Sequence, residues 1–244
     1  MFKISVHQPQ FLPWAGYWHK LAWSDLHVVM AGVQFDQSSY QHRVKLGSTW
    51  LTLPVAKHQS HTMLADVVLA EGYDRALKKI ARTLRDRCMS KANPFGDRLG
   101  DIVAKLETWN HKHLLDLDVY LMQSVGMLLG LECTVSIDTM VRSKGKREDL
   151  DDLLAVHAKG RQFVYLSGSG AREYMHFRSL KQPAATWFQA PKPSLSFDTI
   201  VQLIAQERDP LSVIRAAGMW QSEEGQIDGS ALAETGAGVG PALR

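Results

Sequence analysis

The first candidate for chemistry is a short polar motif that follows the first apolar segment of the chain. His7, Gln8 and Pro9 come directly after residues 2–6, whose alternation and β-branched side chains predict a strand. A histidine titrates near neutrality, so His7 is a candidate general base or acid, and Gln8 is a candidate for orienting a carbonyl or hydroxyl group. Open α/β sheets bind ligands outside the carboxyl ends of their strands, which favours a functional role. The alternative is that His7 caps a turn and satisfies only backbone groups.

A run of small residues after a second apolar segment is the second candidate. Its members are Tyr165, Ser167, Gly168, Ser169 and Gly170. A strand, a small-residue loop and a helix together present backbone N–H groups to an anion, and glycine lets a phosphate approach the backbone closely. The run is not a Walker loop, a dinucleotide fingerprint or a nucleophile elbow, because each of those motifs requires residues that are missing here. A plain tight turn is the alternative.

A polar segment in the first quarter of the chain is the third candidate. Gln34 lies between Val33 and Phe35, and a glutamine between two apolar residues often faces inward. Arg43 is a fixed positive charge that can bind a carboxylate or phosphate through two parallel hydrogen bonds. We therefore consider both residues as substrate-binding candidates. A solvated hairpin arm is the alternative.

The histidines outside these segments give only a weak metal signal. They form two pairs, His58 with His61 and His111 with His113. Neither pair is joined by a clear third ligand, and neither belongs to a His-Glu-x-x-His motif. We therefore predict no metal site.

Length and composition indicate one large globular unit. The chain has 244 residues, of which 45% are hydrophobic and 22% are charged. Folding at this size buries enough surface that no disulfide or metal is needed for stability. We expect a single domain over residues 1–220, with a helical insertion at about 73–130. Residues 221–244 are rich in Gly, Ala and Glu, and we expect them to form a disordered tail.

Charge and cysteine content indicate the location and the partners. The net charge of +3 is compatible with an anionic small molecule and does not require nucleic acid, so we expect no nucleic-acid partner. No apolar run reaches about 18 residues, so we expect no membrane span. The N-terminus does not resemble a signal peptide, and Cys88 and Cys133 do not form a disulfide framework. These features predict a cytoplasmic protein with reduced thiols.

Strands and helices are expected to alternate along the chain. Expected strands are 2–6, 26–30 with a continuation at 33–35, 50–55, 65–70, 133–137 and 163–166. Expected helices are 15–23, 73–89, 99–109, 114–129, 148–158, a short one from 171, 197–207 and a short one from 211. This alternation predicts an α/β fold, a mostly parallel sheet flanked by helices. The segment 33–70 is expected to be antiparallel.

The ordered set of motifs resembles the WbqC-like protein family. The segments that carry the resemblance are HQPQFLPW at 7–14, VQF at 33–35, YQHR at 40–43, WLTLPV at 50–55, YLSG at 165–168 with Tyr174 behind it, and LS at 195–196. Together they extend over roughly residues 4–205. One departure concerns Ala31 and Gly32, which stand where the family usually carries acidic residues. If those acids bind a metal or act as a base in the family, this chain lacks that part.

The resemblance implies a role in the biosynthesis of bacterial surface polysaccharides. It suggests transfer of an acyl or aminoacyl group, such as glycyl, from a thioester donor to the amine of an amino sugar. The donor would be coenzyme A or the phosphopantetheine of a carrier protein, and that carrier protein would be a partner. In this hypothesis His7 takes a proton from the amine, Gln8 and Gln34 position the carbonyl, and Arg43 binds a carboxylate or phosphate. The loop 167–170 holds a phosphate of the donor or a diphosphate of the acceptor.

Two other interpretations remain open at the level of sequence. One is a different kind of enzyme that modifies a sugar nucleotide. The other is a binding or scaffold protein in a biosynthetic complex, without catalysis. The sequence also leaves open whether His7, Arg43 and Ser167 share one site.

Overall fold

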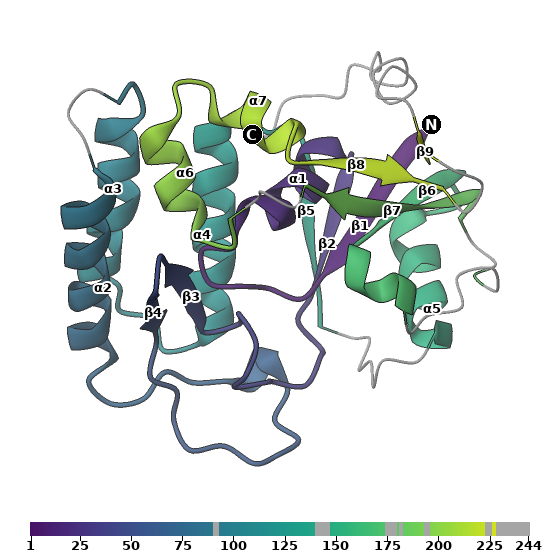
Figure 1. The fold of residues 1–244 in the computed structure, drawn as a ribbon. Helices are drawn as coiled ribbons and strands as arrows, with labels where there is room; N and C mark the ends of the chain where they lie inside the picture. The colour runs from purple at the N-terminus through teal and green to yellow at the C-terminus, as the bar shows by residue number, and fades with distance from the viewer. Residues whose placement is uncertain are drawn as a thin grey trace.

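The computed structural model describes residues 1–89, 93–139, 147–173, 180, 183–192, 196–222 and 226–227. Within this part of the chain the strands of the main sheet are β1 (Phe2–His7), β2 (Leu26–Met30), β5 (Thr134–Asp138), β6 (Phe163–Ser167), β7 (Ala185–Pro191), β8 (Gly218–Gln221) and β9 (Gln226–Ile227). They lie in the order β5-β2-β1-β6-β7-β8-β9. The five strands from β5 to β7 are parallel, and β8 and β9 are antiparallel. The predicted α/β class with a mostly parallel sheet is confirmed (Figure 1).

The strand order reverses direction at β1. The chain goes from β1 to β2 and β5 on one side, and then to β6 and β7 on the other side. Counted along the chain, the five parallel strands lie in the order 3-2-1-4-5, which is the order of doubly wound nucleotide-binding folds. Ligands of such folds bind where the order reverses, outside the carboxyl ends of the two central strands. In this chain that position lies between β1 and β6.

The two faces of the sheet carry different helices. Helix α1 (Ala15–Trp23) lies on the face that includes Ser5 and His27, because its Tyr17 contacts His27. Helix α5 (Arg147–Ala158) packs on the opposite face, where Leu153 contributes to a core with Ile4. The alternation of side chains along each strand sends neighbouring residues to opposite faces. The β1 strand therefore contributes His7 and Ser5 to the α1 face.

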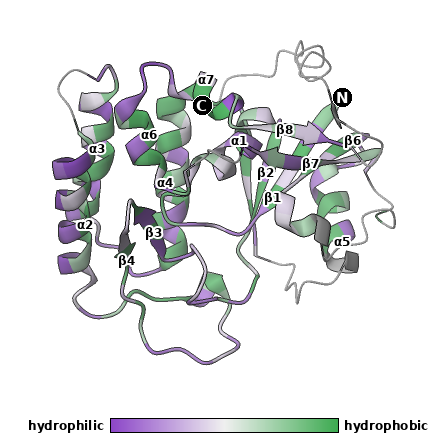
Figure 2. Cartoon of the chain, viewed as in Figure 1, coloured by the Kyte–Doolittle hydropathy of each residue, from purple (hydrophilic) through white to green (hydrophobic). Residues whose placement is uncertain are grey.

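The connection from β2 to β5 contains a hairpin, a 3₁₀ turn and three α-helices. Its elements are β3 (Arg43–Leu46), β4 (Thr49–Thr52), the 3₁₀ turn η1 (Leu64–Asp66), α2 (Tyr73–Cys88), α3 (Gly96–Glu107) and α4 (Leu114–Leu129). The strands β3 and β4 form an antiparallel hairpin. The later helices α6 (Ile200–Gln206) and α7 (Pro210–Arg215) contribute to the same continuous core as α1, α2, α3 and α4. Figure 2 shows the consequence, since the outer side of α2 is hydrophilic and its inner side is hydrophobic.

Several predicted elements differ from the structure. Residues 33–35 form a loop with one isolated bridge from Gln34 to Met63, so β2 is not extended. Residues 65–70 form part of η1 and isolated bridges, because their partners are single residues of other loops. Strand β7 was not predicted. The helix expected at 197–207 begins at 200, where the side chain of Thr199 accepts a hydrogen bond from the Val201 N–H.

Some of the residues named in the sequence analysis lie outside the part of the chain that the structure describes. Tyr174, Leu195 and nearly all of the expected tail at 221–244 belong to this part. Across the described residues, none of the helices combines the length and the apolar character required to cross a membrane.

Candidate functional site

The parallel pairing of β1 with β6 places the ends of two of the predicted segments side by side. Ser5 of β1 is level with Leu166 of β6 in the parallel ladder. Two residues further along each strand, His7 and Gly168 therefore stand at the same level and on the same face of the sheet. We call the position at the carboxyl ends of β1 and β6 the crevice, after the place where doubly wound folds bind their ligands. It is bordered by His7, Gly168 and helix α1.

His7 is half-buried, and its hydrogen bond fixes its tautomer. Its Nδ1 lies 2.9 Å from the carbonyl oxygen of Gln8, which can only accept, so Nδ1 carries the proton. The Nε2 atom of neutral His7 then has a free lone pair. Desolvation and the nearby Lys20 ammonium lower the pKa of His7 to about 3. His7 is therefore neutral at physiological pH and can accept a proton at Nε2.

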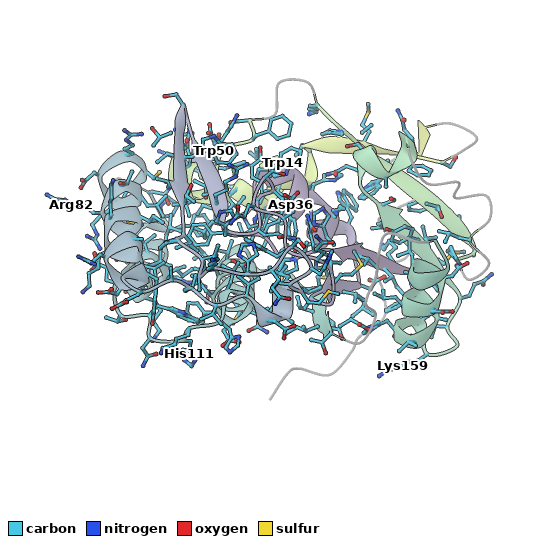
Figure 3. All side chains as sticks on the ribbon, turned by 90° about the horizontal axis from the view of Figure 1, so that it is seen from below. Trp14, Asp36, Trp50, Arg82, His111 and Lys159 are labelled. Carbon is cyan, nitrogen blue, oxygen red and sulfur yellow. The ribbon has the colours of Figure 1, made fainter. Side chains whose placement is uncertain are left out.

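Gln8 is positioned by a second glutamine that the sequence analysis did not select. The side-chain amide of Gln41 donates to Oε1 of Gln8 at 3.0 Å, and Oε1 of Gln41 accepts from the Asp36 N–H at 2.8 Å. Gln41 is fully buried. The Gln8 amide nitrogen thus keeps its N–H groups for another acceptor. In Figure 3, Asp36 lies centrally between Arg82 of α2 and Lys159 beyond α5, so this loop is over the middle of the molecule.

Lys20 is a buried cation beside the crevice. Its side chain extends from α1, the residue is 2% exposed, and its Nζ has no hydrogen-bond partner. The Nζ atom lies 5.6 Å from the centre of the Tyr17 ring and 3.8 Å from the point where a Cβ on Gly168 would be. Burial lowers the pKa of Lys20 to about 7. A charge that is desolvated and unpaired in this way is costly.

A chain of hydrogen bonds fixes α1 on β1 and β2. Ser24 Oγ lies 2.6 Å from both the Lys20 carbonyl and Ser5 Oγ, and Ser5 Oγ lies 2.8 Å from His27 Nδ1. Ser24 is the donor in both of its contacts, to the Lys20 carbonyl and to Ser5 Oγ. On its other side, His27 Nε2 lies 3.2 Å from the Tyr17 hydroxyl, which donates to Met122 Sδ at 3.7 Å. Burial lowers the pKa of His27 and raises that of Tyr17, so this network is uncharged.

Asp118 is a second buried group without a partner, on α4. It is 1% exposed, neither carboxyl oxygen has a hydrogen bond, and burial raises its pKa well above the usual range. The folded state therefore holds this proton at pH values where the unfolded chain has lost it. The carboxyl group thus lowers the free energy of unfolding progressively as the pH rises above about 4.

Replacing Asp118 with leucine is expected to stabilise the protein. Leucine has a similar volume and needs no partner, so the gain in unfolding free energy should be about 1–3 kcal/mol at pH 8. The gain should be smaller at pH 5, closer to the pKa of the unfolded chain. Urea unfolding of both proteins at the two pH values measures this difference. A gain that is the same at both pH values would show that Asp118 does not titrate as described.

Gln34 and Arg43 form hydrogen bonds within their own loops. Gln34 is exposed and donates its side-chain amide to the carbonyl of Ser60. Arg43 donates to the carbonyls of Ser38 and Ser39 and lies over the ring of Trp50, 4.4 Å from its centre. No described contact brings either side chain to the crevice. Their substrate-binding role stays a prediction from sequence.

In the small-residue loop 167–170, the residue nearest to His7 is Gly168, which has no side chain, so the loop offers its backbone at this place. Tyr165 belongs to the core on the α5 face, and strand alternation places the side chain of Ser167 on that face as well. Gly168 faces α1. Ser169 and Gly170 are exposed and begin the 3₁₀ turn η2 (Ser169–Glu173), where a short helix was expected from 171. The structure therefore joins His7 with Gly168, whereas the Ser167 hydroxyl lies on the other side of the sheet.

The described residues contain no group of three His, Cys, Asp or Glu side chains that could hold a metal ion. Among the histidines of the predicted pairs, His58 hydrogen-bonds the Ala56 carbonyl through Nδ1, and His111 packs on Trp109. A histidine outside those pairs, His157, contacts an acid, because its Nε2 atom lies 2.8 Å from Asp138 Oδ2.

The loop between β1 and α1 contains a backbone conformation that is unusual for its residue. Leu12 has a φ of 44°, in the left-handed region, and its side chain is buried. Its carbonyl accepts from the Thr199 hydroxyl at 3.1 Å, and the next carbonyl, of Pro13, accepts from the Ile200 N–H and the Trp18 indole. Contacts from α1 and α6 therefore hold the loop that carries His7 and Gln8.

Sequence reasoning missed Lys20, Tyr17 and Gln41. A lysine in a helix usually reaches solvent, so its position gave no warning. The available signal was its neighbourhood, because residues 15–23 are rich in aromatic and apolar side chains on all sides, which is typical of a fully buried helix.

The strand order defines a doubly wound α/β protein, and the crevice lies where that order reverses, the place at which such folds bind ligands. The sequence matches the WbqC-like protein family over residues 8–194, and the chain belongs to this family. The chain is also similar to the uncharacterized protein Rv1507c of Mycobacterium tuberculosis (strain ATCC 25618 / H37Rv), with 25% identity over 198 residues, covering 77% of this chain and 82% of the relative. No solved structure matches the chain.

Proposed function

We propose that the chain is a group-transfer enzyme, an acyl- or aminoacyltransferase that transfers its group from a thioester to an amine such as that of an amino sugar. The crevice is its active site in this proposal. The observation that carries the proposal is the hydrogen bond of His7 Nδ1 to the Gln8 carbonyl. This bond leaves a proton-accepting Nε2 at the reversal of strand order, where doubly wound folds bind their ligands.

The proposed reaction needs no covalent enzyme intermediate. The amine nitrogen attacks the thioester carbonyl, His7 Nε2 takes the proton that nitrogen loses, and the new C–N bond replaces the C–S bond. The same proton then passes to the leaving sulfur, which departs as a thiol. The Gln8 amide, oriented by Gln41, donates an N–H to the carbonyl oxygen as negative charge develops on it. The Gln34 amide is bonded to Ser60, so Gln8 takes this role alone.

A donor screen tests this proposal. The purified protein and its His7→Ala variant are mixed with acyl-CoAs, aminoacylated carrier proteins and nucleotide sugars, with amino sugars as acceptors. Thermal shift reports binding, and mass spectrometry reports transfer. We expect one thioester to stabilise both proteins and to lose its acyl group only with the parent protein. Transfer at an equal rate by His7→Ala would refute the assignment of the base.

A second candidate function is modification of a sugar nucleotide without a thioester. It is favoured by the strand order 3-2-1-4-5, which is typical of folds that bind nucleotides. Conversion of a nucleotide sugar in the absence of any thioester would select this candidate. Binding without turnover in both proteins would instead indicate a non-catalytic binding protein in a biosynthetic complex.

The same proposal includes the setting of the reaction. It places the enzyme in the cytoplasm, in the biosynthesis of bacterial surface polysaccharides such as O-antigen, as the resemblance described in the sequence analysis implies. A carrier protein that delivers its thioester through phosphopantetheine is the expected macromolecular partner. Fractionation of cells that produce the tagged protein tests the location, because recovery in the membrane or outside the cell would contradict it.

A further inference from the structure

We infer that Lys20 is the anion-binding residue of the crevice, and that its ligand is a phosphate or diphosphate group of the bound substrate. The inference deepens the proposed function, on which it rests for the identity of the donor. Coenzyme A, phosphopantetheine and nucleotide sugars all carry such a group. The shared chemistry is therefore a phosphate ester or anhydride.

The position of the ammonium group supports this assignment. Lys20 Nζ lies between the Tyr17 ring and the backbone at Gly168, at the level of the sheet where β1 and β6 end. It makes no hydrogen bond, although an ammonium group can donate three. A buried side chain with unused donors at this place matches a ligand that supplies acceptor oxygens.

The charges around Lys20 also favour an anion. The groups that face it from β1, β2 and α1 are His7, His27 and Tyr17, and all three are neutral. Desolvation is the sole cause of the lowered Lys20 pKa, so no described carboxylate acts on it. At the end of β2, Ala31 and Gly32 are buried and contribute no charge where the family usually has acids. The crevice therefore holds one cation and no counter-ion from these elements.

Gly168 brings the backbone of the loop close to the ammonium group. Its φ is not in the left-handed region, so the backbone conformation alone does not require glycine. A Cβ at this position would lie 3.8 Å from Lys20 Nζ, in ordinary contact with it. Any larger side chain would fill the space between the loop and the ammonium group. Glycine keeps this approach open for a phosphate.

Binding of an anion at Lys20 would also act on His7. The positive charge of Lys20 is one of the causes of the low His7 pKa. A phosphate that pairs with Lys20 cancels this effect and raises the pKa of His7 toward the range in which a general base works best. The substrate would therefore activate the base as it binds.

The test uses inorganic pyrophosphate as the probe and needs no turnover. Thermal shift and calorimetry compare the parent protein with Lys20→Met, which removes the charge and keeps an unbranched side chain. Lys79→Met is the matched control, because it removes the same charge from the exposed side of α2. We expect pyrophosphate to stabilise the parent and Lys79→Met equally, and to bind Lys20→Met about tenfold or more weakly. Without ligand, Lys20→Met should unfold at a higher temperature than the parent, because its buried charge is gone.

The outcomes separate this inference from the proposed function. Equal affinity of Lys20→Met and the parent, or no binding by the parent at millimolar pyrophosphate, would overturn the anion site even if thioester transfer is observed. Equal weakening in Lys79→Met would also overturn it, because general attraction by the net charge would then explain the binding. Selective loss in Lys20→Met without any transfer by the parent would leave the anion site intact and refute the transferase.

Discussion

Replacing His7 with asparagine is expected to lower the rate of group transfer by about 10²- to 10⁴-fold while leaving the fold unchanged. The asparagine amide nitrogen occupies roughly the place of Nδ1 and can still donate to the Gln8 carbonyl. It has no counterpart of the Nε2 lone pair, so the proton acceptor alone is lost. The rate is measured by mass spectrometry with the donor found in the screen.

Two comparisons make this result specific. Circular dichroism and urea unfolding should give the same folded state for the parent and His7→Asn, because the hydrogen bond within the loop is retained. The binding of pyrophosphate should also be unchanged or tighter, since Lys20 is untouched. A His7→Asn enzyme that keeps more than half of the parent rate would remove His7 from the reaction.

Replacing Trp18 with alanine is expected to lower the free energy of unfolding by about 3–5 kcal/mol. Trp18 is fully buried at the junction of α1, the His7 loop and α4, where its ring contacts Gly126. Its indole N–H donates to the Pro13 carbonyl at 3.1 Å, so the variant loses a hydrogen bond as well as packing. Urea unfolding followed by circular dichroism measures the change.

Trp50→Ala provides the matched comparison for Trp18→Ala. Trp50 is the same residue type, but it is 39% exposed on β4 and mainly contacts the Arg43 guanidinium and the Tyr40 ring. Its replacement should cost less than about 1 kcal/mol. If the two variants lose the same free energy of unfolding, burial of Trp18 in the core around α1 contributes no more to stability than the exposed position of Trp50 does.

Much of the fold could be predicted because the pattern of apolar and polar side chains along the sequence matches their burial in the folded protein. Helix α1 has the predicted bounds, and β2 agrees because its apolar run is buried on both faces. Strand β7 was missed because its burial is uneven along its length, so no simple alternation marks it. The residues 33–35 were expected to extend β2, but Gln34 pairs with Met63, a partner that no local pattern can indicate.

The candidate site could be predicted only for residues that have suitable chemistry and also lie at the carboxyl end of a predicted strand. His7 and Gly168 follow strands, and the reversal of strand order brings those strand ends together. Lys20 was missed because a lysine in a helix usually reaches solvent, although the apolar and aromatic residues around it at 15–23 are typical of a buried helix. Arg43 has the chemistry of an anion-binding residue, but its donors are used by the carbonyls of its own loop.

The central place of β1 has a consequence for the order in which the protein can be made. Its partner β2 ends at residue 30, but its other partner, β6, is about 160 residues away in the sequence, since Ser5 is paired with Leu166. Pairing between such distant segments is slow and leaves a strand edge open until it is complete. The nascent chain therefore carries His7 and Lys20 long before Gly168 leaves the ribosome. A ligand that depends on the finished crevice can stabilise the chain only after Gly168 has been made.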